Sequence, residues 1–319
     1  MTDRPLVLLW TDNAEPYLHA AAAAGLAERA ELVALPRGQS PSDEHCARVE
    51  GLLAWGVPPG LLPRMPRLRW AQALTAGVEG WLALPDLPAG LTLTSARGTH
   101  FESMPENILG ALFYLTKPYA AIAEDQKRGH WARRIATPLN GQTLGILGLG
   151  AIGQAVARLA VALGMRVIGT SRRATPLPGL AEVLPPEGTD AVLAAADFLL
   201  LLLPATPATE SFIDAGRLAR MKPTAWLLNF GRGALIDDDA LIAAVREKRI
   251  AGAILDVFRQ EPLPATHPFW TTPGIMVLPH IGGPHPRRDA IVARLFAENL
   301  GRFLAGEPLR EVVDRQAGY

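Results

Sequence analysis

A glycine-rich loop near the middle of the chain has the residue types and spacing of a phosphate-binding turn. Gly148, Gly150 and Gly153 form G-x-G-x-x-G between an apolar run expected to be a strand (143–147) and a run expected to be a helix (154–163). The first glycine permits a tight turn, the second lets the backbone approach a pyrophosphate, and the third lets the helix pack closely on the strand. An ordinary glycine-rich turn is the alternative. The residues expected to bind a dinucleotide here are Gly148, Leu149, Gly150, Ala151, Ile152 and Gly153.

The end of the next predicted strand indicates which dinucleotide is bound. NAD sites of this kind usually place Asp or Glu about 20 residues after the glycines, where the acid binds the ribose 2′-hydroxyl. Here the run 166–170 is followed by Ser171, Arg172 and Arg173, with no acid. A guanidinium can pair with a 2′-phosphate, whereas a carboxylate would repel it. The stretch favours NADP(H) as cofactor and leaves NAD(H) open; the alternative is a pair of solvated arginines.

Three later apolar runs, each expected to be a strand, are each followed by one polar residue that could do chemistry. These residues are Arg232, Glu261 and His280. Ligands of open α/β sheets bind outside the carboxyl ends of the strands, so the three side chains are expected at one edge of a sheet. Taken singly, the arginine could form a structural ion pair, the glutamate could cap a helix and the histidine could lie in a surface turn. The three runs span residues 225–229, 253–257 and 275–278.

Together these stretches resemble the D-isomer-specific 2-hydroxyacid dehydrogenases, which include glyoxylate/hydroxypyruvate reductases, D-lactate dehydrogenases and phosphoglycerate dehydrogenases. The resemblance covers nearly the whole chain. Arg232 and Glu261 are 29 positions apart and Glu261 and His280 are 19 apart, close to the family pattern. The stretches Leu203–Thr209 and His267–Trp270 also match. Because order and spacing agree as well as residue types, the resemblance is specific.

The resemblance implies an NAD(P)-dependent oxidoreductase that acts on CH–OH groups. It would transfer hydride between nicotinamide and a small 2-oxo acid of the glyoxylate or hydroxypyruvate kind. His280 would be the general acid, and the base in the reverse direction, as suits an imidazole near neutral pH. Glu261 would orient the imidazole and favour its protonated form. Arg232 would bind the substrate carboxylate and polarise the carbonyl.

Further positions carry over from the family. Ala76, Gly77 and Val78 lie in a loop that resembles the segment whose backbone N–H groups hold the substrate carboxylate, together with Arg232 and His280. An ordinary glycine turn is the alternative for this loop. No metal site is implied. The positions that match cofactor-lining residues of the family are Leu203, Pro204, Thr209, Asn229, Phe230, Gly231, Asp256 and Gly282.

The hydrophobic pattern indicates the elements that must position these residues. Short apolar runs alternate with helical patterns or Pro/Gly turns, which indicates βαβ units and parallel sheets. We expect an α/β protein with two doubly wound, Rossmann-like or flavodoxin-like parallel-sheet domains and a cleft between them. Residues 1–100 plus 283–319 would form a discontinuous substrate-binding domain, and residues 101–282 the dinucleotide-binding domain. The first-half runs span residues 6–10, 32–35, 51–55, 68–73 and 91–95.

Two long helices are expected where the chain passes between the domains. One runs over residues 105–119, with Pro105 at its first position and a broad apolar face, and the other over residues 289–304. The polar stretch Glu124–Arg134 between them carries Trp131. In the family this region packs against a second subunit, so the resemblance implies a homodimer. The roles of Trp131 and of Arg97 are left open.

Composition excludes several classes of protein. Lys plus Arg and Asp plus Glu both number 31, so a balanced surface gives no reason to expect nucleic acid or an anionic membrane as partner. Hydrophobic residues make up 49% and charged residues 19%, which excludes disorder throughout. Cys46 is the only cysteine, so an intrachain disulfide is impossible. With no signal peptide or long apolar run, we expect a soluble cytoplasmic protein.

The alternatives lie among relatives of the family. Some relatives are non-enzymatic, dinucleotide-sensing corepressors that keep the same three residues, so only turnover would distinguish them. A phosphite dehydrogenase is a further alternative. Formate dehydrogenases place Gln where Glu261 stands, and the carboxylate argues against that activity.

Overall fold

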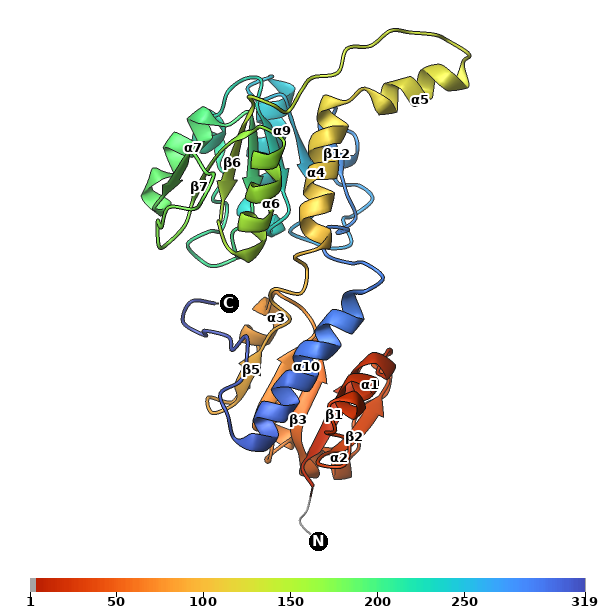
Figure 1. Ribbon diagram of the computed structural model, residues 1–319. Coiled ribbons are helices and arrows are strands. Elements are labelled where there is room, and N and C mark those ends of the chain that lie inside the picture. The colour runs from red at the N-terminus through yellow and green to blue at the C-terminus, as the bar shows by residue number, and fades with distance from the viewer. Residues whose placement is uncertain (1–3, 319) are drawn as a thin grey trace. The chain divides into compact units, whose positions relative to one another are not determined.

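The strands form two separate parallel sheets, as the alternating pattern predicts. Within residues 4–318, the part of the chain that the structure describes, one sheet has five strands and the other seven. The structure is a computed structural model and divides into two compact units, which Figure 1 draws in ribbon form. Unit 1 runs to Thr99 and resumes at His285, and unit 2 is His100–Pro284. The expected α/β fold class is confirmed.

Unit 1 has the strand order β2-β1-β3-β4-β5, which is the flavodoxin-like arrangement. Its strands are β1 (Leu6–Trp10), β2 (Glu31–Leu35), β3 (Val49–Ala54), β4 (Trp70–Ala73) and β5 (Thr92–Thr94). Its helices are α1 (Glu15–Ala23), α2 (Asp43–Arg48), α3 (Glu79–Leu82) and α10 (Arg288–Ala305). The last of these comes from the end of the chain, so the unit is discontinuous in sequence.

Both faces of the unit 1 sheet are buried, which explains its continuous apolar strands. In β1, Leu6 and Leu8 belong to one apolar cluster with α2 and α3, while Val7 and Leu9 belong to another with α1 and α10. The period of two sends successive side chains to opposite faces. Figure 1 shows α10 and α1 side by side on the sheet, where the fully buried Phe296 stacks on the Trp70 ring with centroids 5.8 Å apart.

Unit 2 has the order β12-β11-β10-β9-β6-β7-β8, a Rossmann-type sheet whose order reverses between β6 and β9. Ligands of such sheets bind at the carboxyl ends of the strands near this switch point. The strands are β6 (Thr143–Leu147), β7 (Arg166–Thr170), β8 (Glu182–Leu184), β9 (Phe198–Leu201), β10 (Trp226–Asn229), β11 (Gly252–Leu255) and β12 (Ile275–Val277). The helices are α4 (Ser103–Thr116), α5 (Tyr119–Lys127), α6 (Ala151–Ala162), α7 (Thr189–Ala195), α8 (Ala215–Leu218) and α9 (Asp238–Arg246).

The same alternation buries both faces of the unit 2 sheet. In β10, Leu227 packs in the cluster that contains α7, α8 and α9, and Leu228 packs in the cluster that contains α4 and α6. Both side chains are fully buried. The central strands are therefore held from two sides, and the loops at their carboxyl ends start from fixed positions.

The boundaries of the first long helix differ from those expected. Helix α4 begins at Ser103, two residues before Pro105, because the N–H groups of a first helical turn need no partner within the helix and proline is tolerated there. It ends at Thr116 rather than at residue 119. Lys117 is extended because it precedes Pro118, which disfavours the helical conformation before it.

Two elements were not predicted. Helix α5 covers the first part of the stretch that we expected only to be polar, and Figure 1 shows it extending from the body of unit 2. Strand β8 is short and partly exposed at the sheet edge, so it lacks a strong apolar signal. In residues 4–318, no helix combines the length and the apolar character that crossing a bilayer requires.

Candidate active site

The glycine loop forms a tight turn between β6 and α6, as the sequence predicts. Gly148 has φ +107°, and a Cβ on it would lie 2.8 Å from the Leu202 carbonyl oxygen across the switch point. A Cβ on Gly153 would lie 2.4 Å from the Gly148 carbonyl oxygen, so α6 packs directly on the turn. At Gly150, by contrast, a Cβ would meet nothing within 4 Å in the described part of the chain. Gly148 and Gly153 are therefore needed for the fold, and Gly150 leaves the helix N-terminus open to a ligand.

Ser171 directly follows β7, as the sequence predicts. Its N–H donates to the Leu184 carbonyl of β8 at 2.9 Å, which holds the strand end in place. The side chain of Ser171 is partly exposed, and Arg172 and Arg173 are exposed. The described geometry is compatible with contact to a 2′-phosphate, and the assignment of the three residues stays a prediction.

The loop after β9 is closed by one of its own threonines. The Thr209 hydroxyl donates to the Pro204 carbonyl at 2.7 Å, and its oxygen accepts the Thr206 N–H at 2.8 Å. Thr209 was expected to line the cofactor. Its hydroxyl shapes the loop that contains Leu203 and Pro204, and the contact of Thr209 with a cofactor stays a prediction.

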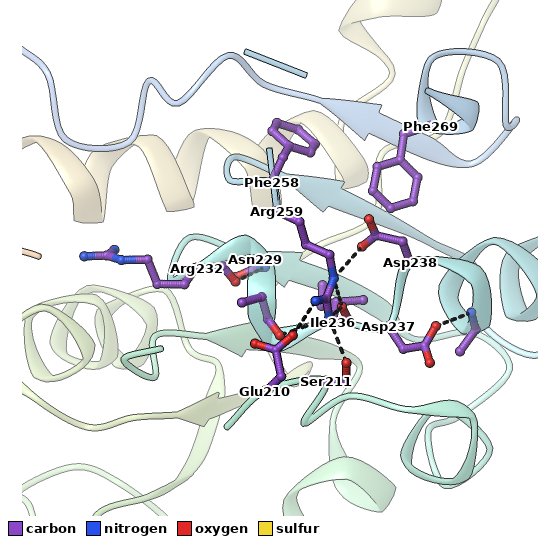
Figure 2. Close-up of polar contacts among 12 residues, drawn as sticks. Glu210, Ser211, Asn229, Arg232, Ile236, Asp237, Asp238, Phe258, Arg259 and Phe269 are labelled. Atoms are coloured by element: carbon purple, nitrogen blue, oxygen red, sulfur yellow. Dashed lines mark hydrogen bonds and ion pairs between the residues drawn. The ribbon is translucent and has the colours of Figure 1, made fainter. Parts of the chain in front are cut away.

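Asn229 similarly shapes the turn that carries Arg232. It is fully buried at the end of β10, where its Nδ2 donates to the Arg232 carbonyl at 2.9 Å and its Oδ1 accepts the Gly231 N–H at 3.1 Å. The partly exposed Arg232 guanidinium donates to the Gly231 carbonyl at 2.7 Å. Figure 2 shows its side chain extending away from the neighbouring cluster around Arg259.

Glu261 and His280 form a hydrogen-bonded pair in unit 2. Glu261 Oε2 lies 2.6 Å from His280 Nδ1, and Glu261 Oε1 accepts the Phe258 N–H at 2.9 Å. Both carboxylate oxygens are therefore engaged, one by the imidazole and one by the backbone of the loop itself. The structure brings together the acid and the imidazole that the sequence paired.

The backbone at His280 is unusual. Its φ is +54°, a left-handed conformation that costs a non-glycine residue about 1–2 kcal/mol. The next two N–H groups compensate for it, because Ile281 N–H donates to Asp256 Oδ1 at 2.7 Å and Gly282 N–H to Oδ2 at 2.9 Å. A Cβ on Gly282 would lie 2.7 Å from Asp256 Oδ2, so this position requires glycine.

Asn107 on α4 supports the same turn, a role that sequence reasoning missed. Its Nδ2 donates to the Ile281 carbonyl at 3.0 Å and to the Gly282 carbonyl at 3.1 Å, and Ser103 Oγ donates to the Gly282 carbonyl at 3.3 Å. The spacing of Ser103 and Asn107 places them on one face of a helix. Their proximity to residues 281–282 arises only in the folded unit.

In unit 1, the loop that was expected to hold the substrate carboxylate follows β4 directly. Its shape is set locally by Thr75 Oγ1, which donates to the Gly77 carbonyl at 2.5 Å. Its start is anchored by Arg288, the first residue of α10, which is buried and donates to the Leu74 carbonyl. The same guanidinium lies 4.4 Å from the centroid of the Trp55 ring.

Arg288 belongs to a polar cluster at the carboxyl edge of the unit 1 sheet. It pairs with Asp289 at 2.6 Å, and Asp289 Oδ2 accepts from Asn13 Nδ2 at 2.8 Å. Burial, followed by the charge of Asp289, raises the pKa of the Tyr17 hydroxyl well above its usual range, so this group stays neutral. Sequence patterns do not indicate this cluster, because Asn13 and Tyr17 are more than 250 residues away from Arg288 and Asp289.

The family model for the D-isomer specific 2-hydroxyacid dehydrogenase NAD-binding domain matches residues 109–282, more than half of the chain. The chain belongs to this family. It is 33% identical to glyoxylate/hydroxypyruvate reductase A of Serratia proteamaculans, over 96% of this chain and 97% of that protein. It is also 33% identical to glyoxylate/hydroxypyruvate reductase B of Pectobacterium carotovorum, over 90% and 91%.

Solved structures of this dehydrogenase family have the same fold. A D-isomer specific 2-hydroxyacid dehydrogenase from Xanthobacter autotrophicus, in complex with NADPH and MES, matches with a TM-score of 0.87 at 29% identity, over 99% of this chain and all of that one. An NADPH-dependent glyoxylate/hydroxypyruvate reductase from Sinorhizobium meliloti, in complex with NADP and sulfate, matches with a TM-score of 0.84 at 29% identity, with the same coverage.

The structure places Arg97 and Trp131, the two residues whose roles the sequence left open, in different surroundings. Arg97 pairs with Glu311 through a 2.8 Å contact within unit 1, where it fastens the C-terminal segment beside β5. Trp131 is 94% exposed and Ile135 is 97% exposed, and both lie on the segment that follows α5. Both large apolar side chains are thus available on one short segment to pack against another surface.

Asp256 gives a pH-dependent prediction for stability. Its burial raises the pKa of the carboxyl above the ordinary 3.8, an effect that its two backbone hydrogen bonds only partly offset. Between pH 3.8 and the raised pKa this carboxyl binds more protons in the native state than in the unfolded chain, so its contribution to the free energy of unfolding falls as pH rises. The fall is at most about 1.4 kcal/mol per pH unit. Asp256→Asn should remove it.

Urea unfolding of both proteins at several pH values above 3.8 measures this difference. The Asn variant should be less stable overall, because its Nδ2 faces the Gly282 N–H, but the gap to the native protein should narrow as pH rises. Stability curves that run parallel over this range would contradict the expectation.

Proposed function

We propose that the protein is an NAD(P)-dependent 2-oxo acid reductase, equivalently a D-2-hydroxyacid dehydrogenase. The observation that carries the proposal is the 2.6 Å contact between Glu261 and His280, in the same unit as Arg232 and the glycine loop. Relatives named glyoxylate/hydroxypyruvate reductases support a small substrate such as glyoxylate or hydroxypyruvate.

His280 is proposed as the proton donor to the substrate carbonyl oxygen. Glu261 occupies Nδ1, so Nε2 is the ring nitrogen left to hold and transfer the proton. The hydrogen bond from the Phe258 N–H to the other oxygen of Glu261 prevents the carboxylate from rotating away. In the reverse direction the same nitrogen accepts the proton from the 2-hydroxyl group.

Arg232 is proposed to bind the substrate carboxylate and polarise the carbonyl. Its planar guanidinium presents two donors in a fixed geometry that matches a carboxylate. Asn229 holds the backbone on both sides of it, which limits the positions that the side chain can reach. The N–H groups of Ala76, Gly77 and Val78 in unit 1 are proposed as further donors to the carboxylate, which makes unit 1 the substrate-binding domain.

The residues present fit an NADP(H) cofactor. The turn at Gly148 and the uncapped helix that starts at Ala151 can hold a pyrophosphate. Ser171 and Arg172 can hold a 2′-phosphate. When bound, the nicotinamide supplies or accepts the hydride. Asp256 and Gly282 hold the His280 turn next to the end of β11, and residues 229–231 form the wall of the proposed nicotinamide site.

The first test of the proposal is His280→Ala. Loss of the general acid should lower kcat with glyoxylate and hydroxypyruvate by about 10²–10⁴-fold, because that is the usual contribution of general acid–base catalysis. NADPH oxidation followed at 340 nm measures it. His19→Ala is the matched control, because His19 is exposed on α1.

Wild-type turnover in His280→Ala would refute the mechanism. A native protein that binds NADPH but turns over none of a panel of 2-oxo acids would indicate a dinucleotide-sensing protein instead. Oxidation of phosphite by the native protein would indicate a phosphite dehydrogenase, the other alternative within the family.

Cofactor choice is proposed to favour NADPH. Each charge-assisted hydrogen bond to the 2′-phosphate contributes about 1.5–3 kcal/mol. Solvent exposure weakens such contacts, so one or two of them give roughly a tenfold to several-hundredfold preference. The double substitution Ser171→Asp with Arg172→Ala should move kcat/KM toward NADH. Arg166→Ala is a matched control, because Arg166 is exposed at the opposite end of the same strand. Equal kcat/KM of the native protein with both cofactors would overturn the proposal.

A homodimer is proposed from the segment that follows α4. Asp125 is buried and binds both Arg128 and Arg134, and the Arg134 hydrogen bond lowers its pKa below the usual range. These ion pairs fix the segment that presents Trp131 and Ile135 to solvent. A two-fold interface would cover both side chains.

Light scattering tests the dimer. The native protein should have the mass of two 34.2 kDa chains at micromolar concentration, and Trp131→Asp with Ile135→Asp should shift it toward one chain. Leu159→Asp, at an exposed apolar position on α6, is the control. A monomer with native Trp131 and Ile135 would disprove the assembly.

A further inference from the structure

Arg259 binds more groups than a surface arginine normally does. It lies in the loop between β11 and Glu261, and its side chain is 34% exposed. Its guanidinium donates to the Ile236 carbonyl from Nε at 3.1 Å, to the Ala234 carbonyl at 3.2 Å and to Ser211 Oγ at 2.8 Å. It also pairs with Glu210 (Figure 2). One side chain therefore joins three segments of unit 2.

The first of these segments carries Arg232. The short 3₁₀ turn Gly233–Leu235 follows Arg232 directly, and the two carbonyls that Arg259 binds belong to this turn and to the residue after it. The carbonyls at the end of a helical turn lack partners within it, so an external donor stabilises them. Arg259 supplies these donors to the carbonyls of Ala234 and Ile236, two and four residues after Arg232.

The second segment carries Glu261, and it touches the first through backbone atoms. A Cβ on Gly233 would lie 1.9 Å from the Phe258 carbonyl carbon and 2.3 Å from the Arg259 nitrogen. The backbone next to Arg232 therefore lies directly against the backbone of Arg259. Glu261, two residues later, accepts the Phe258 N–H and holds His280.

The third segment is the loop after β9. Ser211 has φ +48° and its N–H donates to the Ala234 carbonyl at 2.8 Å, the same oxygen that Arg259 binds. The ion pair between Arg259 and Glu210 is half-exposed and contributes little by itself, as surface pairs usually do. The hydrogen bonds to the two carbonyls and the hydroxyl are therefore the part of the cluster that constrains the backbone.

We propose that Arg259 is a positioning residue that fixes the loop of Glu261 relative to the turn that follows Arg232. Its backbone lies in the loop that carries Glu261, and its guanidinium donates to the carbonyls of the turn after Arg232. Neither segment can therefore shift without breaking the hydrogen bonds of the Arg259 side chain. The proposal rests on the proposed function for its catalytic consequence. Catalysis is sensitive to such placement, because displacing a catalytic group by about 1 Å can cost 10²-fold in rate.

Arg259→Gln tests the proposal, because it removes the multiple donors and the charge while keeping a polar side chain. With glyoxylate, kcat/KM should fall by about 10- to 100-fold, through a lower kcat and a higher KM for the 2-oxo acid. The Kd for NADPH should change less than threefold. Arg249→Gln is the matched control, since Arg249 is an exposed arginine of the same unit that pairs with Glu247.

Arg259→Lys separates positioning from charge. Lysine keeps the ion pair with Glu210, but its single ammonium cannot reproduce the planar fork that reaches two carbonyls and a hydroxyl. Kinetics of Arg259→Lys should therefore stay impaired at least severalfold. Full restoration by lysine, wild-type kinetics in Arg259→Gln, or a loss that only follows the unfolded fraction measured by circular dichroism would each overturn the proposal.

Hydrogen exchange of the native protein and of Arg259→Gln provides a test that does not need turnover. Amides of residues 232–238 and 258–261 should exchange faster in the variant, and amides of β6 and α6 should not change. If the native protein reduced none of the 2-oxo acids, the proposed function would fail, while this measurement would still decide whether Arg259 holds the two segments. Unchanged exchange in both segments would refute the positioning role.

Discussion

The carboxylate of Asp256 and the two N–H groups that it accepts are the interaction on which the rest of the candidate site depends. The residue is fully buried at the end of β11, and its two oxygens bind the backbone of Ile281 and Gly282. These bonds hold the backbone directly after His280, which has an unfavourable left-handed φ. Without them the turn would relax, and the imidazole would lose its position relative to Glu261. A buried carboxylate is costly, but it offers two strong acceptors at the point where two strands end.

Glycines make the close approaches around this interaction possible. Gly282 leaves room for an oxygen of Asp256, and Gly233 leaves room for the backbone of Phe258 and Arg259. A side chain at either position would separate strand-end loops that now touch. The loops of β10, β11 and β12 therefore form one packed layer at the sheet edge. The polar side chains extend from a layer that is rigid because its backbones are in contact.

The sequence predicted the strands and the three polar residues because both leave local signals. Buried parallel strands appear as apolar runs, and each strand-end loop lies within a few residues of its strand, as with Arg232 after β10 and His280 after β12. It did not predict β8, which is partly exposed, or α5, whose amphipathic pattern is weak. The sequence also did not indicate the supporting roles of Asn107 and Arg259, because the groups that they hold in the site loops are backbone carbonyls. A carbonyl has the same identity at every position, so sequence spacing cannot indicate which one a side chain will bind.

Both units use an arginine to hold backbone at the carboxyl edge of their sheets. In unit 1, Arg288 donates to the Leu74 carbonyl just before the loop at Gly77, and in unit 2, Arg259 donates to the carbonyls of Ala234 and Ile236. The carboxyl ends of parallel strands present carbonyl oxygens that have left the ladder and need donors. Arginine suits this place because it carries several donors in one plane and keeps its charge at any physiological pH. Each arginine also pairs with a carboxylate, Arg288 with Asp289 and Arg259 with Glu210, so the backbone of these loops is fixed by cations whose charge is balanced locally.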